Sequence, residues 1–450
     1  MRKSKTASVL AGFIAFGLLA AACGGDDGDS ADTTASSETT AAAATTAPAA
    51  SGATTAPATT GAGSAAPGGG CTDGAEPIKI GGLAQAQNFA GMEDGIKAIV
   101  DKANKECIGG RPLEFVGLQD DGSDPAKNLS LAQSLVEQDE VFAIIATSAV
   151  LLPATTDYLA EQKVPFFGWG FMPGFCGDDS WGYGFNGCLS AFALGYSDET
   201  NGSLIEPIAE QLGKPAEEVT LVTFNADDDS GTFGKLQYDA LFTPAQVLGT
   251  ADVPVQGAGD YTQYVNLVEE KNPDAVMVST DFVSAIKMKA ALAASSYEGL
   301  VYDYVTYIPG LLDSSKDTAA ALEGGFAVSQ FPANEDATPA IAQITEDLKA
   351  SGSQLPFATQ GASIGYWSTE LLRQMLVATA AKGEITPDTF RSVVEGGFTS
   401  ETVEGGLGPV TYPDYHKSLA PCSGLVQVVD GAYQSSVPFT CYTMLPAKNG

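Results

Sequence analysis

Residues 108–154 read IGGRPLEFVGLQDDGSDPAKNLSLAQSLVEQDEVFAIIATSAVLLPA and predict the fold of the chain. The segment 113–119 is mainly apolar and ends at a turn in which Asp124 is placed to cap a helix that starts with Pro125. Apolar residues then recur at helical spacing, and the short apolar run 141–145 has the composition of a buried parallel strand. This strand, helix and strand unit predicts an α/β fold.

Two hydroxyl side chains, Thr147 and Ser148, follow the second predicted strand. In an open α/β sheet, ligands bind beyond the carboxyl ends of the strands, so both hydroxyls are candidate ligand contacts. The alternative is that they cap the helix that follows. Gln85 and Phe89 stand in the same position after an earlier predicted strand, 78–82, and join the candidate site for the same reason.

The composition of the 450-residue chain limits its partners. The length allows two domains, because single cores seldom exceed about 250–300 residues. The chain has 22 basic and 55 acidic residues, and its net charge of −33 argues against a nucleic acid or an anionic membrane surface as a partner. His416 is the only histidine, which leaves few options for a metal site, and we expect neither a metal nor a cofactor.

The N-terminus predicts export. Basic residues precede the apolar run 7–22, which is typical of a secretory signal, and the following Cys23 closes a segment that resembles a bacterial lipobox, although Ala20 stands where the usual leucine would be. We therefore expect residues 1–23 to hold the signal peptide and the anchor cysteine, with the lipid on Cys23 as the only membrane attachment. Residues 24–70 are rich in Ala, Thr, Ser, Pro and Gly and predict a disordered tether.

Six cysteines remain beyond the anchor. An even number in an exported chain predicts three disulfides, for which fifteen connectivities are possible. We expect pairing between neighbours in the sequence, and structural rather than redox roles, because no Cys-x-x-Cys motif is present. The expected pairs are Cys71 with Cys107, Cys176 with Cys188, and Cys422 with Cys441.

Seven segments, taken in their order along the chain, resemble a type I periplasmic binding protein, closest to the leucine/isoleucine/valine-binding proteins of ABC importers. The resemblance covers residues 76 to about 445, and the order of the segments makes it specific. The segments are IKIGGLAQ (78–85), IGGRPLEFVGLQDDGSDPAKN (108–128), VPFFGWG (164–170), VTLVTFNADDDSGTFG (219–234), NPDAVMVSTD (272–281), EGGFAVSQF (323–331) and GLGPVTYPDYHK (406–417).

The resemblance implies two doubly wound α/β lobes that are joined by three hinge crossings and enclose a ligand. The crossings are expected near residues 186–196, 331–334 and 408–409. The first lobe would then comprise residues 71–190 and 334–408, and the second lobe residues 191–333 and 409–450.

The resemblance also implies a function. It indicates a monomeric, non-enzymatic, extracytoplasmic solute-binding protein that delivers an amino-acid-like ligand, or a related carboxylate or amide, to an ABC permease. The alternative is a ligand-sensing receptor domain, because the same fold also serves sensors.

Several family positions can be transferred to this sequence. Ser148 matches a serine that holds the ligand's carboxylate, and Gly170 and Phe171 match a strand exit whose backbone faces the ligand. The family's acidic partner of an α-ammonium group falls near Thr306–Tyr307, where no carboxylate stands. Asp281 or Asp303 could supply that charge. If neither does, the ligand is not an ordinary amino acid.

Aromatic residues dominate the rest of the candidate site, and they predict an apolar cleft with few polar anchors. Some of them can instead serve only for packing between or within the lobes. They are Phe89, Trp169, Phe171, Phe282 and Tyr307.

Three other motifs suggest different chemistry. Gly361–Gly365 fits the G-x-S-x-G nucleophile elbow around Ser363, with Asp388 or Asp414 and then His416 in the order of a hydrolase, but no convincing strand leads into it. The G-x-G-x-x-G match at 182–187 has no preceding strand. The Asp-rich turn at 227–231 lacks the spacing of a calcium loop. We therefore expect no catalytic residues.

Overall fold

The computed structural model describes residues 70–448 except 228 and 309. The predicted signal peptide, Cys23 and residues 24–69 of the predicted tether lie outside the described residues. Within the part that is described, no helix has the length and apolar character needed to cross a membrane.

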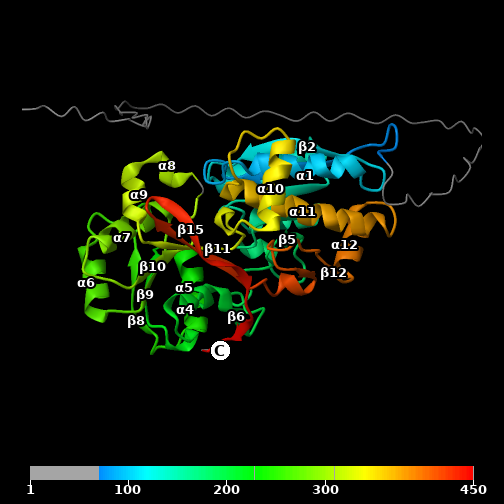
Figure 1. The fold of residues 1–450 in the computed structure, drawn as a ribbon. Helices are drawn as coiled ribbons and strands as arrows, with labels where there is room; N and C mark the ends of the chain where they lie inside the picture. Colours follow the sequence, from blue (N-terminus) through cyan, green and yellow to red (C-terminus); the bar gives the residue numbers. More distant parts are fainter. Residues whose placement is uncertain (1–69, 228, 309, 449–450) are drawn as a thin grey trace, which may run out of the picture. The chain divides into compact units, whose positions relative to one another are not determined.

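The first sheet has five parallel strands in the order β2-β1-β3-β4-β5. They are β1 (Ile78–Ala84), β2 (Leu113–Asp120), β3 (Ala143–Thr147), β4 (Phe166–Gly168) and β5 (Gly182–Gly184). The intervening helices are α1 (Met92–Glu106), α2 (Pro125–Glu137) and α3 (Pro153–Glu161). Three helices from late in the chain follow one another beside this sheet: α10 (Pro339–Ala350), α11 (Gln360–Ala380) and α12 (Pro387–Glu395). Figure 1 shows α10 and α11 beside α1.

The second sheet has seven strands in the order β15-β14-β11-β10-β9-β7-β8. Five are parallel: β7 (Leu221–Ala226), β8 (Val247–Val253), β9 (Ala275–Ser279), β10 (Leu300–Asp303) and β11 (Phe326–Ser329). The antiparallel pair β14 (Cys422–Val429) and β15 (Ala432–Cys441) completes it. Its helices are α4 (Glu206–Leu212), α5 (Asp229–Leu241), α6 (Thr262–Lys271), α7 (Phe282–Ala293), α8 (Leu311–Ser314) and α9 (Lys316–Leu322).

Short elements connect these parts. β6 (Glu199–Asn201) pairs with β16 (Met444–Pro446), and β12 (Phe398–Thr399) pairs with β13 (Thr411–Tyr412). The 3₁₀ helices are η1 (Pro173–Phe175), η2 (Gly202–Leu204), η3 (Ala216–Glu218), η4 (Asn334–Asp336) and η5 (Asp414–His416).

The predicted fold class and local structure of the 108–154 segment are confirmed. The Asp124 carboxylate accepts hydrogen bonds from the backbone N–H groups of Ala126 at 2.8 Å and Lys127 at 3.1 Å, which caps α2 as expected. All five residues of β3 are buried, because helices cover both faces of a parallel strand. β3 starts at Ala143, two residues later than the apolar run that predicted it.

The three disulfides join the predicted pairs.

The predicted lobe boundaries remain a prediction. Contacts just after the third predicted crossing show where the chain passes to the second sheet. Leu419 still forms a β-bridge with Gly187, and the Ala420 N–H donates to the Asn186 carbonyl at 3.0 Å. The chain then enters the second sheet at Cys422, the first residue of β14.

Close contact between α1 and α11 explains the G-x-S-x-G match. A Cβ atom on Gly361 would lie 2.1 Å from the Phe89 carbonyl oxygen, and one on Gly365 would lie 2.2 Å from that of Met92. Both glycines are therefore needed for helix packing. The motif lies in the first turns of α11 and not at a strand-to-helix turn, so the nucleophile-elbow interpretation is wrong in its local structure.

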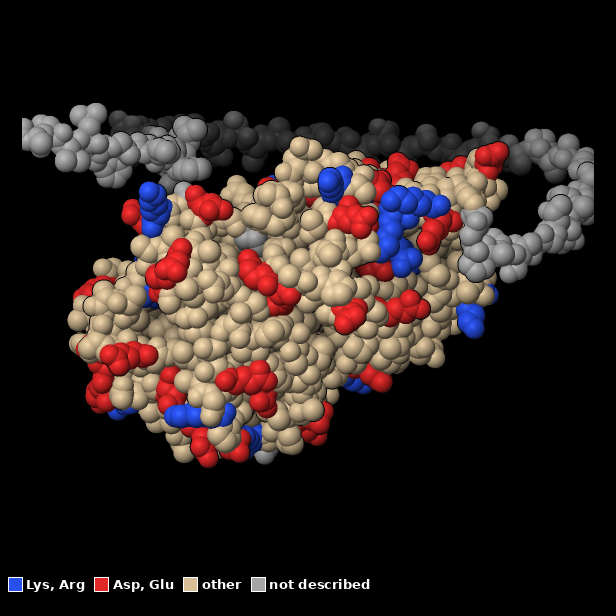
Figure 2. Space-filling model, viewed as in Figure 1, with Lys and Arg blue, Asp and Glu red and all other residues tan. Residues whose placement is uncertain are grey.

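Charge is distributed broadly over the surface. Figure 2 shows acidic side chains spread over the visible face, with fewer basic ones among them. An acidic surface of this kind favours solubility.

The buried tyrosines predict a loss of stability at high pH. Burial raises the pKa of a group of tyrosines above its ordinary value, so the folded chain keeps protons that the unfolded chain loses. They are Tyr183, Tyr302, Tyr366 and Tyr412. The contribution of these tyrosines to the free energy of unfolding is therefore fully present below about pH 10. It falls as the pH rises above that value, by up to about 1.4 kcal/mol per pH unit for each tyrosine.

Denaturant midpoints measured across this pH range test the expectation. The Tyr302→Phe variant serves as a control, because it removes one of these hydroxyls, which is buried and has no hydrogen-bond partner among the described residues. We expect a smaller loss with pH in that variant. Equal midpoints at about pH 8 and pH 11 in the parent protein would contradict the assignment.

Candidate functional site

Aromatic side chains from both sheets meet beyond the carboxyl ends of their strands. The Trp169 ring, one residue past β4, lies 5.3 Å from Phe171 and 6.4 Å from Phe331, which follows β11. Tyr307, which follows β10, lies 6.5 Å from Phe331. The Trp169 Nε1–H donates to the Gln330 Oε1 at 2.9 Å. Strand exits of the first and second sheets are thus in direct contact.

Trp169, Tyr307, Gln330 and Phe331 border an open hollow, which we call the cleft hollow; its empty space of about 240 Å³ includes the solvent at its mouth. It brings together Trp169 and Tyr307, which the sequence predicted from two different sheets. Its other lining residues were not predicted. The full lining is Trp169, Tyr304, Tyr307, Val328, Ser329, Gln330, Phe331 and Gln360. Gln330 had a usable signal, since it directly follows the short apolar segment that forms β11; Gln360 had none, because it belongs to the start of α11.

The hydroxyls of Thr147, the last residue of β3, and of Ser148 do not cap the next helix. α3 begins at Pro153 with Leu152 as its N-cap residue, and no side chain caps it. The Ser148 Oγ instead accepts a hydrogen bond from the Val150 N–H at 3.2 Å, and the Thr147 Oγ1 has no partner among the described residues. Both residues are 1% exposed. The capping alternative is therefore wrong, and the ligand role of both stays a prediction.

The backbone groups at the exit of β4 bond within the protein. The Gly170 N–H donates to the Asn186 Oδ1 at 3.0 Å, and its carbonyl accepts from the Leu189 N–H at 2.8 Å. A Cβ at position 170 would lie 1.7 Å from the Gly187 carbonyl oxygen, so only glycine fits. The Phe171 carbonyl accepts from the Ser190 hydroxyl at 3.1 Å. The predicted contacts of these backbone groups with ligand stay a prediction.

The Asp281 carboxylate caps a helix. Its Oδ1 accepts from the N–H groups of Val283 at 3.0 Å and Ser284 at 3.2 Å, which are in the first turn of α7, and its Oδ2 accepts from the Gln256 N–H at 3.1 Å. These bonds satisfy both carboxylate oxygens. Phe282, the first residue of α7, is half-buried, and no ring contact joins it to the aromatic group around Trp169 in the described part of the chain.

Asp303 forms a buried ion pair with Lys289, whose side chain is 3% exposed against 0% for the aspartate. The Asp303 Oδ1 also accepts from the N–H groups of Val305 and Thr306, both at 2.6 Å, and so shapes the turn that leads to Tyr307. Burial lowers the pKa of Lys289, while the negative charge of Asp303 opposes that change. Asp303 therefore already has a cationic partner inside the protein.

The Tyr307 side chain contacts the second predicted crossing. Its hydroxyl donates to the Glu335 Oε2 at 2.6 Å and accepts from the Asn334 N–H at 2.9 Å. Burial, followed by the charge of Glu335, raises the pKa of Tyr307 far above its ordinary value. Tyr307 thus offers its ring to the cleft hollow while its hydroxyl is occupied.

A family model for periplasmic binding proteins matches residues 77–432. The chain belongs to the periplasmic binding protein family. None of the curated proteins compared with it gives a significant match.

Solved structures of solute-binding proteins share the fold of this periplasmic binding protein. The fatty acid ABC transporter substrate-binding protein from Thermomonospora curvata aligns with a TM-score of 0.64 and 17% identity over 85% of this chain and 95% of that one. A solute-binding protein of an ABC transporter from Rhodopseudomonas palustris BisB5, in complex with 3,4-dihydroxybenzoic acid, gives 0.60 and 18% over 83% and 98%. A possible leucine/isoleucine/valine-binding protein from Rhodopirellula baltica SH 1 gives 0.60 and 16% over 80% and 96%.

Two predicted ligand contacts of this periplasmic binding protein, Gln85 and Phe89, lie in the segment that follows β1. The Gln85 side chain is buried, and its Oε1 accepts a hydrogen bond from the Asn88 Nδ2 at 3.3 Å. The backbone N–H of Gln85 donates to the Thr147 carbonyl at 3.4 Å. Phe89 belongs to the main hydrophobic core together with α1 and α11 residues. Their role in ligand binding stays a prediction.

The residues of the hydrolase alternative lie in separate settings. Ser363 is buried in α11, and Asp388 forms an exposed ion pair with Lys163. His416 places its Nε2 3.0 Å from the Glu395 Oε1 and its Nδ1 3.3 Å from the Phe175 carbonyl. The contacts of His416 are thus with Glu395 and Phe175, away from the arrangement that a Ser-His-Asp triad requires.

Proposed function

We propose that this periplasmic binding protein is an extracytoplasmic solute-binding protein that captures a small aromatic carboxylate between its lobes and delivers it to an ABC permease. The ligand bridges both lobes and stabilises the closed state, which shifts the hinge equilibrium toward closure. The lipid on Cys23 holds the protein at the membrane, and the protein acts as a monomer without catalysis.

The observation on which this proposal rests is the combination of an aromatic hollow with carboxylates that already have partners. Trp169, Tyr307 and Phe331 supply aromatic faces, while Asp281 caps a helix and Asp303 pairs with Lys289. An α-ammonium group entering this site finds neither predicted carboxylate free, so a zwitterionic amino acid loses its usual anchor.

Polar groups at the site suit the rest of such a ligand. We propose that the Ser148 hydroxyl and the unpartnered Thr147 hydroxyl face the ligand's carboxylate. The amides of Gln330 and Gln360 line the hollow and can bond to a ring hydroxyl or a carboxylate oxygen. Solved structures with the same fold support a carboxylate ligand: two solute-binding proteins are in complex with the aromatic acids 3,4-dihydroxybenzoic acid and 4-hydroxybenzoate, and a third serves a fatty acid ABC transporter.

Thermal denaturation with added ligands tests the proposal. We expect 4-hydroxybenzoate or benzoate to raise the melting temperature, because a ligand at 100 times its Kd adds about 2.7 kcal/mol to the stability of the native state. Leucine, isoleucine and valine are expected to leave it unchanged. The opposite pattern would refute the aromatic-acid assignment.

Replacement of Trp169 by leucine is expected to weaken binding of the same aromatic acid about tenfold, because one aromatic face of the hollow is lost. Trp181→Leu is the matched control: its ring stacks with Arg391 at 5.2 Å, away from the hollow. Isothermal titration gives both affinities. If both variants bind as the parent protein does, the ligand does not occupy the cleft hollow.

A further inference from the structure

We propose that this protein has a second ligand site, which lies on α11 and takes a small organic cation with an apolar group. The site is an open hollow between α11, the loop 400–410 and the exit of β5, whose empty space of about 330 Å³ includes the solvent at its mouth; we call it the α11 hollow. It shares no lining residue with the cleft hollow. The two hollows are therefore distinct.

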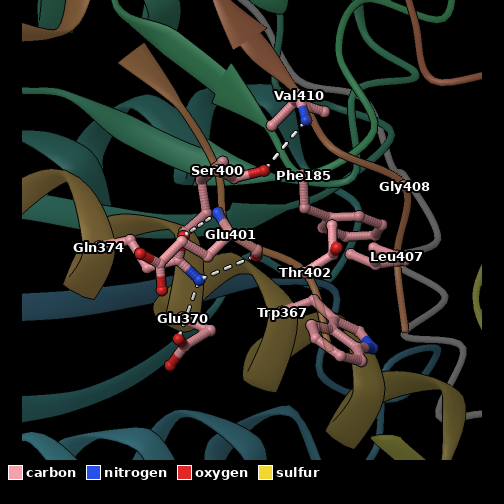
Figure 3. Close-up of a pocket in the computed structure, with 11 residues that line it drawn as sticks. Phe185, Trp367, Glu370, Gln374, Ser400, Glu401, Thr402, Leu407, Gly408 and Val410 are labelled. Atoms are coloured by element: carbon pink, nitrogen blue, oxygen red, sulfur yellow. Dashed lines mark hydrogen bonds between the residues drawn. The ribbon is translucent and has the colours of Figure 1, made fainter. Parts of the chain in front are cut away.

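One side of the α11 hollow is apolar and aromatic. Phe185, which follows β5, and Trp367 on α11 are both nearly buried, and Leu407 from the loop lies between them in Figure 3. Leu371 and Val410 add further apolar surface. Aromatic faces of this kind attract a cation through the negative charge density of the ring face.

The other side of the hollow is polar, and hydrogen bonds of Gln374 hold it together. The Gln374 Nε2 donates to the Glu370 Oε1 at 3.0 Å and to the Glu401 carbonyl at 3.3 Å, while its Oε1 accepts from the Glu401 N–H at 2.7 Å. Figure 3 shows these bonds opposite the aromatic side. The loop is further fixed by the Val410 N–H, which donates to the Ser400 Oγ at 3.0 Å. The hollow is thus held open by defined contacts.

The charges that line the hollow are both negative. Glu370 is paired with Arg373, which donates from Nε at 2.8 Å and from Nη2 at 2.7 Å, and these contacts hold the pKa of Glu370 below its usual value despite burial. Glu401 is exposed at the rim, and no ion pair involves it within the described chain. A carboxylate at the rim of a hollow that is also lined by two aromatic side chains repels an anion and attracts an organic cation.

Benzylammonium is the probe, with benzyl alcohol as its neutral counterpart. Titration of the full folded chain, followed by ligand-observed NMR, is expected to show saturable binding of benzylammonium and at least about fivefold weaker binding of benzyl alcohol. Absence of saturable binding, or equal binding of the neutral and cationic probes, would overturn the proposal.

Single-residue variants identify where benzylammonium binds. Glu401→Gln is expected to weaken benzylammonium about three- to fivefold, whereas Glu404→Gln, three residues along the same exposed loop but outside the lining, leaves it unchanged. Trp169→Leu in the cleft hollow also leaves it unchanged, which separates this site from the proposed ligand site. Equal effects of the two glutamate variants, or competition between benzylammonium and the cleft ligand, would contradict a separate site.

Discussion

Lys289→Met is expected to lower the free energy of unfolding by about 3–5 kcal/mol, because it leaves Asp303 buried without its cationic partner. The lysine also donates from Nζ to the Phe326 carbonyl at 2.6 Å and to the Thr306 Oγ1 at 3.0 Å, so the substitution removes further hydrogen bonds. These contacts link α7, β11 and the turn after β10. Chemical denaturation followed by circular dichroism measures the change.

Two variants make this test specific. Lys287→Met lies two residues away on the same helix with an exposed side chain, and we expect it to change stability by less than about 0.5 kcal/mol. The double variant Lys289→Met with Asp303→Asn removes both charges, and it is expected to recover part of the loss. If Lys289→Met is no less stable than Lys287→Met, the ion pair does not have the assigned role.

Gly95→Ala is expected to destabilise the protein by about 1–3 kcal/mol, even though alanine favours a helix over glycine by about 1 kcal/mol. The added Cβ would lie 2.0 Å from the Ala362 carbonyl oxygen and 2.6 Å from the Tyr366 nitrogen, both of them backbone atoms of α11. The two helices would have to move apart, which also disturbs the core they share. Denaturant midpoints report the loss.

Gly234→Ala in α5 is the matched helical control. Its Cβ would meet only side-chain atoms, the nearest being the Ser279 Oγ at 3.0 Å, which can rotate away. We expect no loss of stability in this variant. A similar loss in both glycine variants would show that helix propensity or flexibility, and not the close approach of α1 and α11, decides the effect.

The parts of the fold that the sequence predicted are those with local causes. The Asp124 cap and the buried strand β3 follow from neighbouring residues, since a capping carboxylate and a buried apolar run act within one element. The same reasoning does not find β8, because this strand of the second sheet is only partly buried and mixes apolar with polar residues.

The candidate site was predicted less completely because it depends on contacts between distant segments. Trp169 and Gln330 are 161 residues apart, and only the placement of β4 beside the end of β11 brings them to 2.9 Å. Lys289 was overlooked for a related reason. Within the mainly apolar helix α7, Lys289 is one of a few polar residues and carries no local sign of its role. Its partner Asp303 lies at the end of β10, so only the tertiary structure reveals the pair.

α11 packs against α1 but is synthesised much later, because it lies in the last quarter of the chain. The core beside the first sheet combines residues of α1 with residues of α11, and about 250 residues separate the two helices. A nascent chain that ends before residue 339 therefore exposes the apolar face of α1 with nothing to cover it. The core beside the first sheet therefore cannot be completed until α11 has been made, so this part of the molecule folds only after most of the chain has been synthesised.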